Sequence, residues 1–378
     1  MADHPSIPSQ GAYEAHWAQP DDGPDPFLGE IVEQPEALRR AARSLSEQVD
    51  ALERIGRSSL GGRPLLLTGM GSSFHACLAA SSALGRRGIL AVTANAAELL
   101  HFRRNALTDV GLAVLISQSG QSVEVVRLAG ELTRLAHRPR LVAITNGNDN
   151  PLVSMVDVAL DTAAGEEVGP STKSYAATFV PLAALVEALL SSPEDESGSD
   201  VVGRVVSRAH QAADAADRVL EAPETLAGEL TEWLDGRRSL TILGRGVAVG
   251  PAETSALVLK EAARFAAEAL DAAEFRHGPL ELASPDLAVV VLSIEERTRR
   301  LDGRLAREIA GHGSAVMVVG NVEDDANGVQ NIAIGRLDPL LSCAVAVIPA
   351  QLLSWRLALA KGWRPGRFLL ASKVTTRE

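Results

Sequence analysis

Thr68-Gly69-Met70-Gly71-Ser72-Ser73 is the first of two short polar stretches that decide the fold, and Ser117-Gln118-Ser119-Gly120-Gln121-Ser122 is the second. Each follows an apolar run, at 64–67 and 112–116, that predicts a buried strand. Each also precedes a segment in which apolar residues recur at helical spacing. Strands that alternate with helices in this way predict an α/β fold built on a parallel sheet.

Both junctions carry groups that bind an anion. Backbone N–H groups at a helix start lack intrahelical partners and lie at the positive end of the helix dipole. Side-chain donors are added by Ser72, Ser73, Ser117, Gln118, Ser119 and Ser122, whereas Lys and Arg are absent from both stretches. We therefore predict a phosphate monoester site made of hydroxyls and amides. Serines that only cap helices are the alternative, but two serine-rich junctions at one sheet edge favour the phosphate.

Composition narrows the class of protein. The chain has 378 residues and a formal net charge of -12, so its overall field does not attract nucleic acid or an anionic membrane. Its two cysteines, without a secretory signal, indicate reduced thiols and a cytoplasmic location. We expect no apolar run long enough to cross a membrane. The histidines are scattered without ligand spacing, and no glycine triad marks a dinucleotide site, so neither a metal nor another cofactor is expected.

An internal repeat organises the chain. After the first copy, strands are expected again at 239–243, 287–292 and 314–319, with helices near 250–268 and 296–311. We therefore predict two tandem three-layer α/β/α domains of flavodoxin-like type, each with a parallel sheet. The expected limits are an N-terminal arm at 1–28, a first, phosphate-binding domain at 29–195, a second domain at 200–350, and a C-terminal helix and tail at 351–378 that closes the active site. The second copy has Leu292-Ser293-Ile294-Glu295-Glu296 where the first has its serines, so one phosphate site per chain is expected.

Several motifs together resemble one family. They are Glu30-Ile31-Val32-Glu33-Gln34-Pro35, Gly71-Ser72-Ser73, Ser117-Gln118-Ser119-Gly120, Ser171-Thr172-Lys173, Leu259-Lys260-Glu261, His277-Gly278-Pro279 and Lys373-Val374-Thr375. The chain resembles the double sugar-isomerase-domain (SIS) proteins, in particular the isomerase half of glutamine–fructose-6-phosphate aminotransferase. The stretch 273–279 is more similar to the stand-alone glucosamine-6-phosphate deaminases and isomerases. No cysteine precedes Cys77, so a glutamine-hydrolysing domain is not expected.

The resemblance implies a role for each matching residue. Glu261 would transfer the proton, and His277 would open the sugar ring, often from a neighbouring subunit. Lys373 would form an imine with a ketose or stabilise an enolate. Residues of the two junctions would bind phosphate, and Ser171 would line the sugar hydroxyls. On the residues alone, a solvated Glu261 and a frayed basic terminus at Lys373 remain open.

These roles imply an enzyme that acts on a hexose or amino-hexose 6-phosphate, most closely a glucosamine-6-phosphate deaminase, without a cofactor. An aldose–ketose isomerase without deamination, or a sugar-phosphate-binding regulator, are the alternatives. Val258 stands where the family usually has a lysine, and this departure points to an unusual substrate or to loss of turnover. We also expect a homodimer, because a histidine lent by a neighbour requires one and the apolar segment 346–359 needs covering.

Overall fold

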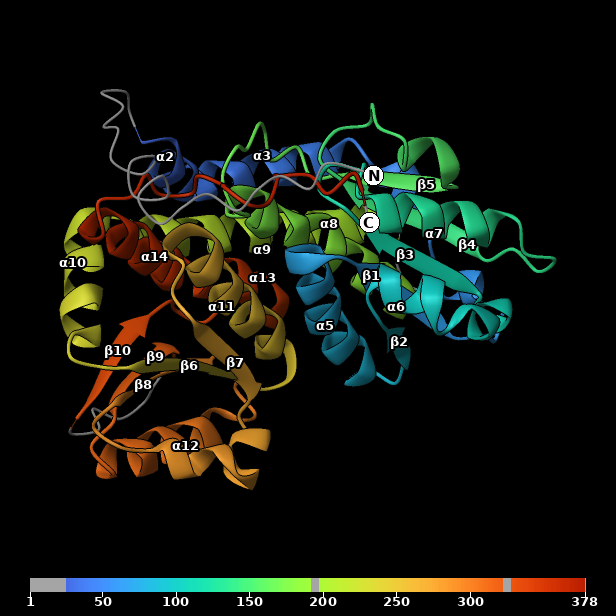
Figure 1. Ribbon diagram of the computed structural model, residues 1–378. Coiled ribbons are helices and arrows are strands. Elements are labelled where there is room, and N and C mark those ends of the chain that lie inside the picture. Colours follow the sequence, from blue (N-terminus) through green and yellow to red (C-terminus); the bar gives the residue numbers. More distant parts are fainter. Residues whose placement is uncertain (1–24, 192–196, 322–327, 378) are drawn as a thin grey trace, which may run out of the picture.

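The structure is a computed structural model that describes residues 25–191, 197–321 and 328–377. It contains two five-stranded sheets in which all strand pairs are parallel (Figure 1). The first sheet has the order β2 (Ala91–Thr93), β1 (Leu65–Gly69), β3 (Leu112–Ile116), β4 (Arg140–Thr145), β5 (Val158–Asp161). The second has the order β7 (Ala267–Asp271), β6 (Ser239–Gly244), β8 (Leu287–Ser293), β9 (Ala315–Gly320), β10 (Val329–Ala333).

The two sheets repeat one topology, which confirms the predicted fold class and the internal repeat. In each sheet the chain starts on an inner strand, moves one strand outward and then returns to build the other side. The place where this direction reverses lies between β1 and β3 in the first sheet and between β6 and β8 in the second. Ligands of open α/β sheets bind outside the carboxyl ends of the strands at this switch point. Both predicted polar junctions follow the strands that flank it.

The helices cover the sheets and join the two halves of the chain. They are α2 (Pro26–Val32), α3 (Gln34–Ser46), α4 (Val49–Glu53), α5 (Gly71–Gly85), α6 (Ala96–His101), α7 (Val123–Thr133), α8 (Lys173–Leu190), α9 (Gly198–Val219), α10 (Pro223–Leu234), α11 (Val249–Ala263), α12 (Arg299–Gly311), α13 (Pro339–Ala346) and α14 (Ile348–Ala360). Helices α3, α8 and α9 pack on one another and form a layer that runs past both sheets (Figure 1). This layer and the α5–α11 contact fix the two halves relative to each other.

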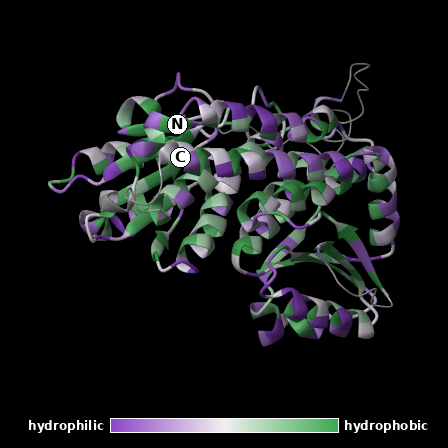
Figure 2. Cartoon of the chain, turned by 180° about the vertical axis from the view of Figure 1, so that it is seen from behind, coloured by the Kyte–Doolittle hydropathy of each residue, from purple (hydrophilic) through white to green (hydrophobic). Residues whose placement is uncertain are grey.

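The core consists of the sheets and the helices next to them, as the hydropathy colouring in Figure 2 illustrates. All residues of β1 and β3 are buried, which is typical of central parallel strands. Two helical stretches, Lys173–Leu190 and Pro339–Ala360, are long and apolar enough to cross a membrane, contrary to the sequence-based expectation. Their windows are 89% and 72% buried inside the protein, so this apolar surface is already covered by the fold.

The structure corrects or refines three sequence-based expectations. The helix expected at 250–268 ends at Ala263, where Arg264 adopts a left-handed conformation (φ 46°), and β7 follows it. The apolar residues of 30–57 have helical spacing, and the structure divides this stretch into α2, α3 and α4. The segment 346–359 belongs to α13 and α14, and most of its apolar residues are buried inside the chain, although Leu359 is 38% exposed. This segment therefore does not call for a partner. Residues 1–24 of the expected arm and 192–196 of the linker lie outside the described residues.

Candidate active site

A cavity of about 230 Å³ lies at the switch point of the first sheet. Its walls come from the starts of α5 and α7, the loop before α8, one face of α11 and the C-terminal tail. Eight of the predicted site residues line it: Ser72, Ser73, Gln118, Ser119, Ser122, Ser171, Glu261 and Lys373. Residues that are far apart in the sequence thus share one cavity, and the tail forms part of its wall.

The hydroxyl-rich end of the cavity is formed by two helix starts. Gly71 has a φ of +51°, which allows the chain to turn from β1 directly into α5. Ser117 is 3% exposed, and its hydroxyl lies 3.3 Å from that of Ser122, so it lies behind the cavity wall rather than in it. The N–H of Val123 at the start of α7 donates to the carbonyl of Thr375 in the tail at 3.1 Å. The tail therefore reaches the hydroxyl-rich end of the cavity.

Glu261 faces the cavity from α11. Leu257, one helical turn earlier, lines the same wall, whereas Val258 is 2% exposed and does not line the cavity. The replacement of the usual lysine by Val258 therefore lies in the packed interior. Burial raises the pKa of Glu261 to about 7; the charge of Lys373 lowers it and that of Glu167 raises it further. A carboxyl with this pKa can take up and release a proton near neutral pH.

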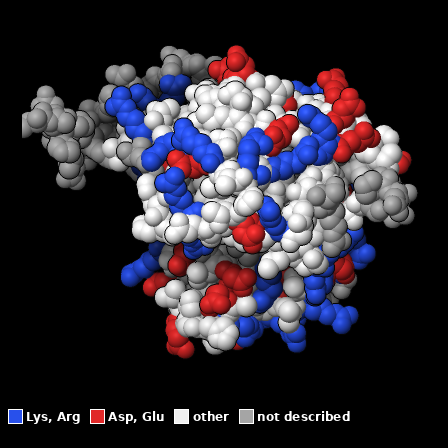
Figure 3. Space-filling model, turned by 90° about the vertical axis from the view of Figure 1, so that its right-hand side faces the viewer, with Lys and Arg blue, Asp and Glu red and all other residues white. Residues whose placement is uncertain are grey.

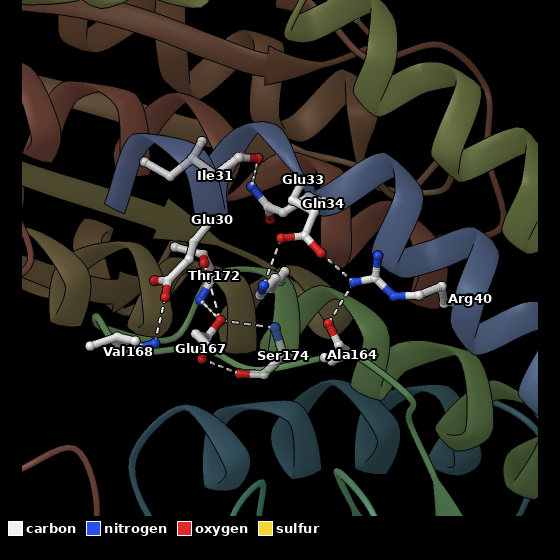
Figure 4. Close-up of polar contacts among 12 residues, drawn as sticks. Glu30, Ile31, Glu33, Gln34, Arg40, Ala164, Glu167, Val168, Thr172 and Ser174 are labelled. Carbon is white, nitrogen blue, oxygen red and sulfur yellow. Dashed lines mark hydrogen bonds and ion pairs between the residues drawn. The ribbon is translucent and has the colours of Figure 1, made fainter. Parts of the chain in front are cut away.

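The loop before α8 is held by a carboxylate and a guanidinium from two distant helices (Figure 4). Glu30 of α2 accepts hydrogen bonds from the N–H groups of Val168 and Gly169. Arg40 of α3 donates to the carbonyl of Ala164 at 2.7 Å. Burial raises the pKa of Glu30 and the charge of Glu167 raises it further, while the hydrogen bonds from Val168 and Gly169 and the charge of Lys373 lower it. These contacts fix the loop that sequence analysis treated only as a source of Ser171.

Glu167 lies at the centre of this loop, and its side chain is fully buried. It accepts hydrogen bonds from the N–H of Thr172 at 2.9 Å, the N–H of Ser174 at 3.0 Å and both of their hydroxyls. The Thr172 hydroxyl is therefore used inside the loop, while Ser171 lines the cavity. Burial opposes ionisation of Glu167, but Lys373 and these hydrogen bonds outweigh it and lower its pKa.

Lys373 of the tail is bound to this carboxylate. Its Nζ donates to Glu167 Oε2 at 2.5 Å and to the carbonyl of Gly169 at 2.7 Å. The lysine side chain is 21% exposed and also lines the cavity. Sequence reasoning noted Glu30 only as part of the motif 30–35, and it gave no role to Glu167, whose partner Lys373 lies 206 residues away. The acidic loop Gly165-Glu166-Glu167 was the only local signal.

Glu124 of α7 is another cavity residue that sequence reasoning missed. It is 8% exposed, and among the described residues its Oε2 has no hydrogen-bond partner. Its place two residues after Ser122 was the available signal.

His277 is the predicted site residue that the structure does not bring into the cavity of the same chain. It ends a short 3-10 helix, Glu274–His277, that follows β7, and its side chain is exposed. In one chain the ring-opening role implied by the resemblance therefore has no support from proximity to Glu261.

The matching junction of the second sheet is filled by carboxylates. Glu295, after β8, accepts from the N–H of Val247 at 3.3 Å and pairs at 3.0 Å with Arg86, which directly follows α5. Gly246 repeats the positive φ of Gly71 (+56°), and a Cβ on it would approach Glu295 Oε1 to 2.7 Å. An internal carboxylate thus takes the place that an anionic ligand would have, as expected for one phosphate site per chain.

On the face shown in Figure 3, basic and acidic side chains lie interspersed. Among the described residues, no three or more His, Cys, Asp or Glu side chains lie close enough together to hold a metal ion. Cys77 and Cys343 are both free and buried.

Comparison with known proteins matches the chain to the SIS domain model over residues 63–188 and 234–359. Glutamine--fructose-6-phosphate aminotransferase [isomerizing] of Aeropyrum pernix is 30% identical over 362 residues, which cover 93% of this chain and 57% of that protein. The enzyme of the same name from Pyrobaculum aerophilum is 29% identical over 358 residues, again 93% and 57%. The chain thus spans a little over half the length of these relatives.

Solved structures share the fold. The C-terminal domain of glucosamine-fructose-6-phosphate aminotransferase from Francisella tularensis superposes with a TM-score of 0.76 at 22% identity, covering 91% of this chain and 98% of that one. Tagatose-6-phosphate ketose/aldose isomerase from Escherichia coli gives 0.74 at 21% identity, with 91% and 96% covered. Glucosamine-6-phosphate deaminase from Thermotoga maritima gives 0.68 at 21% identity, with 92% and 98% covered.

Proposed function

The chain belongs to the SIS domain family, and we propose that it is a sugar-phosphate isomerase of the glucosamine-6-phosphate deaminase type. The observation that carries this proposal is the composition of one cavity. One end of this cavity offers uncharged hydrogen-bond donors from two helix starts. The cavity also holds Glu261, whose pKa of about 7 suits a proton-transfer base. A phosphate ester bound at the first end would direct the opposite end of a small sugar toward that base.

The donors that would bind the phosphate are the hydroxyls of Ser73, Ser119 and Ser122, the Gln118 amide and the free N–H groups of the helix starts. Ser117 would support them from behind through its contact with Ser122. Ser72 and Ser171 line the same cavity and would contact the phosphate and the sugar hydroxyls.

The reaction would begin with ring opening, for which a second copy of this chain would supply His277. In the open-chain sugar, the ionised Glu261 would remove the proton from C2 and return it to C1. A 2-amino sugar would become a C2 imine, which water hydrolyses to ketose phosphate and ammonia. A sugar with a C2 hydroxyl would become the ketose directly. Neither reaction requires a cofactor.

The deaminase form is favoured by the segment Ala273-Glu274-Phe275-Arg276-His277-Gly278-Pro279, which is similar to that of stand-alone amino-sugar-phosphate enzymes. A sugar-phosphate sensor is the second candidate function. The observation that favours it is the exposed position of His277, which leaves the cavity of a single chain without a group for ring opening.

A substrate panel tests the proposal. The protein is incubated with glucosamine 6-phosphate, glucose 6-phosphate and fructose 6-phosphate, and ammonia and ketose are measured. We expect ammonia from the first sugar. In Glu261→Gln the rate should fall by about 10²–10⁴-fold while binding of the sugar phosphate is retained. Glu253→Gln is the matched control, because Glu253 lies on α11 but does not line the cavity.

Two results contradict the proposal. Binding without turnover of any sugar in the panel identifies a sensor. An unchanged rate in Glu261→Gln rejects the assigned base.

A further inference from the structure

The amine of Lys373 is not presented to the cavity as a free nucleophile. Two of its hydrogen-bond donors are engaged by oxygen atoms, Glu167 Oε2 at 2.5 Å and the Gly169 carbonyl at 2.7 Å. Both acceptors belong to the loop before α8, which Glu30 and Arg40 hold from the other side. A protonated lysine has three donors, so one remains to point at a bound ligand.

The contacts of Glu167, the acceptor of this ion pair, favour its ionised form. Glu167 is fully buried, and besides Lys373 it accepts hydrogen bonds from two backbone N–H groups and two hydroxyls. An ionised carboxylate takes all of these bonds, whereas a protonated one would lose acceptor capacity. Removal of the lysine charge would leave this buried anion uncompensated. The pair is therefore stable as ammonium and carboxylate.

We propose that Lys373 acts as a fixed ammonium that stabilises negative charge on the reacting sugar, and that Glu167 is the positioning residue that holds it there. This inference rests on the proposed function and assigns the chemistry of one of its residues. It chooses between the two roles that the family resemblance leaves for Lys373. The ammonium donates a hydrogen bond to an oxygen of the substrate and forms no covalent bond with it.

The charge that Lys373 stabilises arises in the proton transfer. When Glu261 takes the proton from C2 of the open-chain aldose, the electron pair of the C–H bond forms the C1–C2 double bond. The electron pair of the C1 carbonyl moves onto its oxygen, which becomes an enolate. The remaining N–H of Lys373 donates to this oxygen, and Glu261 then returns the proton to C1. The proton of the C2 hydroxyl or amine passes to the C1 oxygen as the double bond from C2 to its oxygen or nitrogen forms. No atom is exchanged with Lys373, and no oxidant or reductant is needed.

Imine formation would require a different environment. An amine attacks a carbonyl through its lone pair, and an ammonium has none. Lys373 would have to give up its proton and leave both Glu167 and the Gly169 carbonyl. Among the described residues that line the cavity, the remaining acidic side chains are Glu124 and Glu261, and no further Lys or Arg compensates Glu167. Imine formation by Lys373 would thus break the contacts with Glu167 and the Gly169 carbonyl that hold the tail in place.

Substitutions of Lys373 separate the two roles. Lys373→Arg keeps a positive charge and cannot form an imine, whereas Lys373→Met keeps neither property. We expect Lys373→Arg to retain activity within about tenfold and Lys373→Met to lose about a hundredfold or more. Because Lys373→Met leaves the buried Glu167 without its partner, circular dichroism and thermal unfolding of both variants are measured first, and rates are compared between folded proteins. Equal losses in the two variants would overturn the proposal.

Chemical trapping provides a second arm. Borohydride is added to the wild-type protein with fructose 6-phosphate, and the intact mass and the peptide containing Lys373 are measured. We expect no sugar adduct on Lys373. A reduced adduct at this residue, formed in proportion to turnover, would show an imine and overturn the proposal.

A third arm does not depend on turnover. The protein is treated with a limiting amount of an amine-reactive reagent, and labelling of Lys373 is compared with that of exposed Lys260 by mass spectrometry. We expect slow labelling of Lys373 in the wild type and faster labelling in Glu167→Gln. Glu33→Gln is the matched control: it disrupts the neighbouring Glu33–Lys173 ion pair (2.7 Å) and should leave Lys373 protected.

The arms distinguish the two proposals. Protected Lys373 in a protein that turns over no sugar would reject the proposed function and keep the fixed geometry. Turnover with an imine adduct would keep the function and reject the fixed ammonium. Labelling of Lys373 as fast as Lys260 in the wild type would reject the geometry itself.

Discussion

The carboxyl of Glu261 lies where burial and two neighbouring charges act on it in different directions. Burial raises its pKa to about 7, Lys373 lowers it and Glu167 raises it. The base is active when ionised, so kcat/KM should fall as the pH decreases below about 7. A pH–rate profile with the sugar that turns over measures this limb. A limb near the ordinary glutamate value of 4.5 would contradict the buried, charge-coupled site.

Removing the charge of Glu167 and removing the charge of Lys373 should shift the acidic limb of the pH–rate profile in opposite directions. Glu167→Gln removes a negative charge that raises the pKa of Glu261, so the limb should move to lower pH. Lys373→Met removes a positive charge that lowers this pKa, so the limb should move to higher pH. Both profiles are measured on the residual activity of each variant. Shifts in the same direction would show that the substitutions act by general loosening of the site.

Single residues show how far the sequence predicts the site. Glu261 and Lys373 were identified because each lies in a short motif that resembles a family pattern. Glu167 was not, because its importance comes from a partner 206 residues away in the chain. A loop with two adjacent glutamates gives no local sign of which carboxyl is buried.

At the scale of elements, the two sheets use the same junctions differently. In the first sheet the starts of α5 and α7 leave donors open to a cavity. In the second, Glu295 accepts the N–H of Val247 and pairs with Arg86 from the other half of the chain. The second junction therefore contributes to stability instead of binding a ligand.

This difference predicts that a substitution at the second junction lowers the stability of the protein without loss of catalytic activity. Glu295→Ala should lower the free energy of unfolding by about 1–3 kcal/mol, because it leaves a buried N–H and an arginine without their acceptor. Turnover at the first junction should be retained. Chemical denaturation measures the change. Glu296→Ala is the control, since its side chain is 68% exposed and its pair with Arg299 contributes only about 0–1 kcal/mol. Equal effects of the two substitutions would contradict the assigned role of Glu295.

Element boundaries show where sequence patterns stop being informative. Strand β7, Ala-Glu-Ala-Leu-Asp, continues the alanine-rich composition of α11 and was predicted as part of it. The helix ends at Arg264 in a left-handed conformation, a place where glycine usually marks the end. Strands β1 and β3 were predicted correctly because their apolar runs are flanked by glycine and serine.

At the scale of the whole molecule, the cavity is assembled from both halves and the C-terminal tail. The repeat and its switch point were predictable from the order of strands and helices. The packing of the halves was not, because it depends on buried helices such as α8 whose sequence shows no polar face. His277 lies outside the cavity of its own chain, so the proposed chemistry needs a second copy.

Mixed dimers test that requirement. A chain with Glu261→Gln and a chain with His277→Ala are given different affinity tags and co-expressed. The dimer that carries both tags is then purified. If each site combines Glu261 of one chain with His277 of the other, one of two sites is intact, and about half of the wild-type activity is expected. Both parent homodimers should be inactive. An inactive mixed dimer would place His277 in the same chain as its Glu261, and an active His277→Ala homodimer would place His277 outside the reaction.

The central claim is that Glu261 moves a proton on a sugar phosphate bound in this cavity. Hydrogen exchange measures that event directly. The protein is incubated in D2O with glucosamine 6-phosphate or fructose 6-phosphate, and deuterium at C1 and C2 is followed by NMR. We predict exchange in the wild type and none in Glu261→Gln, although the variant still binds the sugar. Exchange at the wild-type rate in Glu261→Gln, or none in a wild-type protein that binds the sugar, would contradict the account.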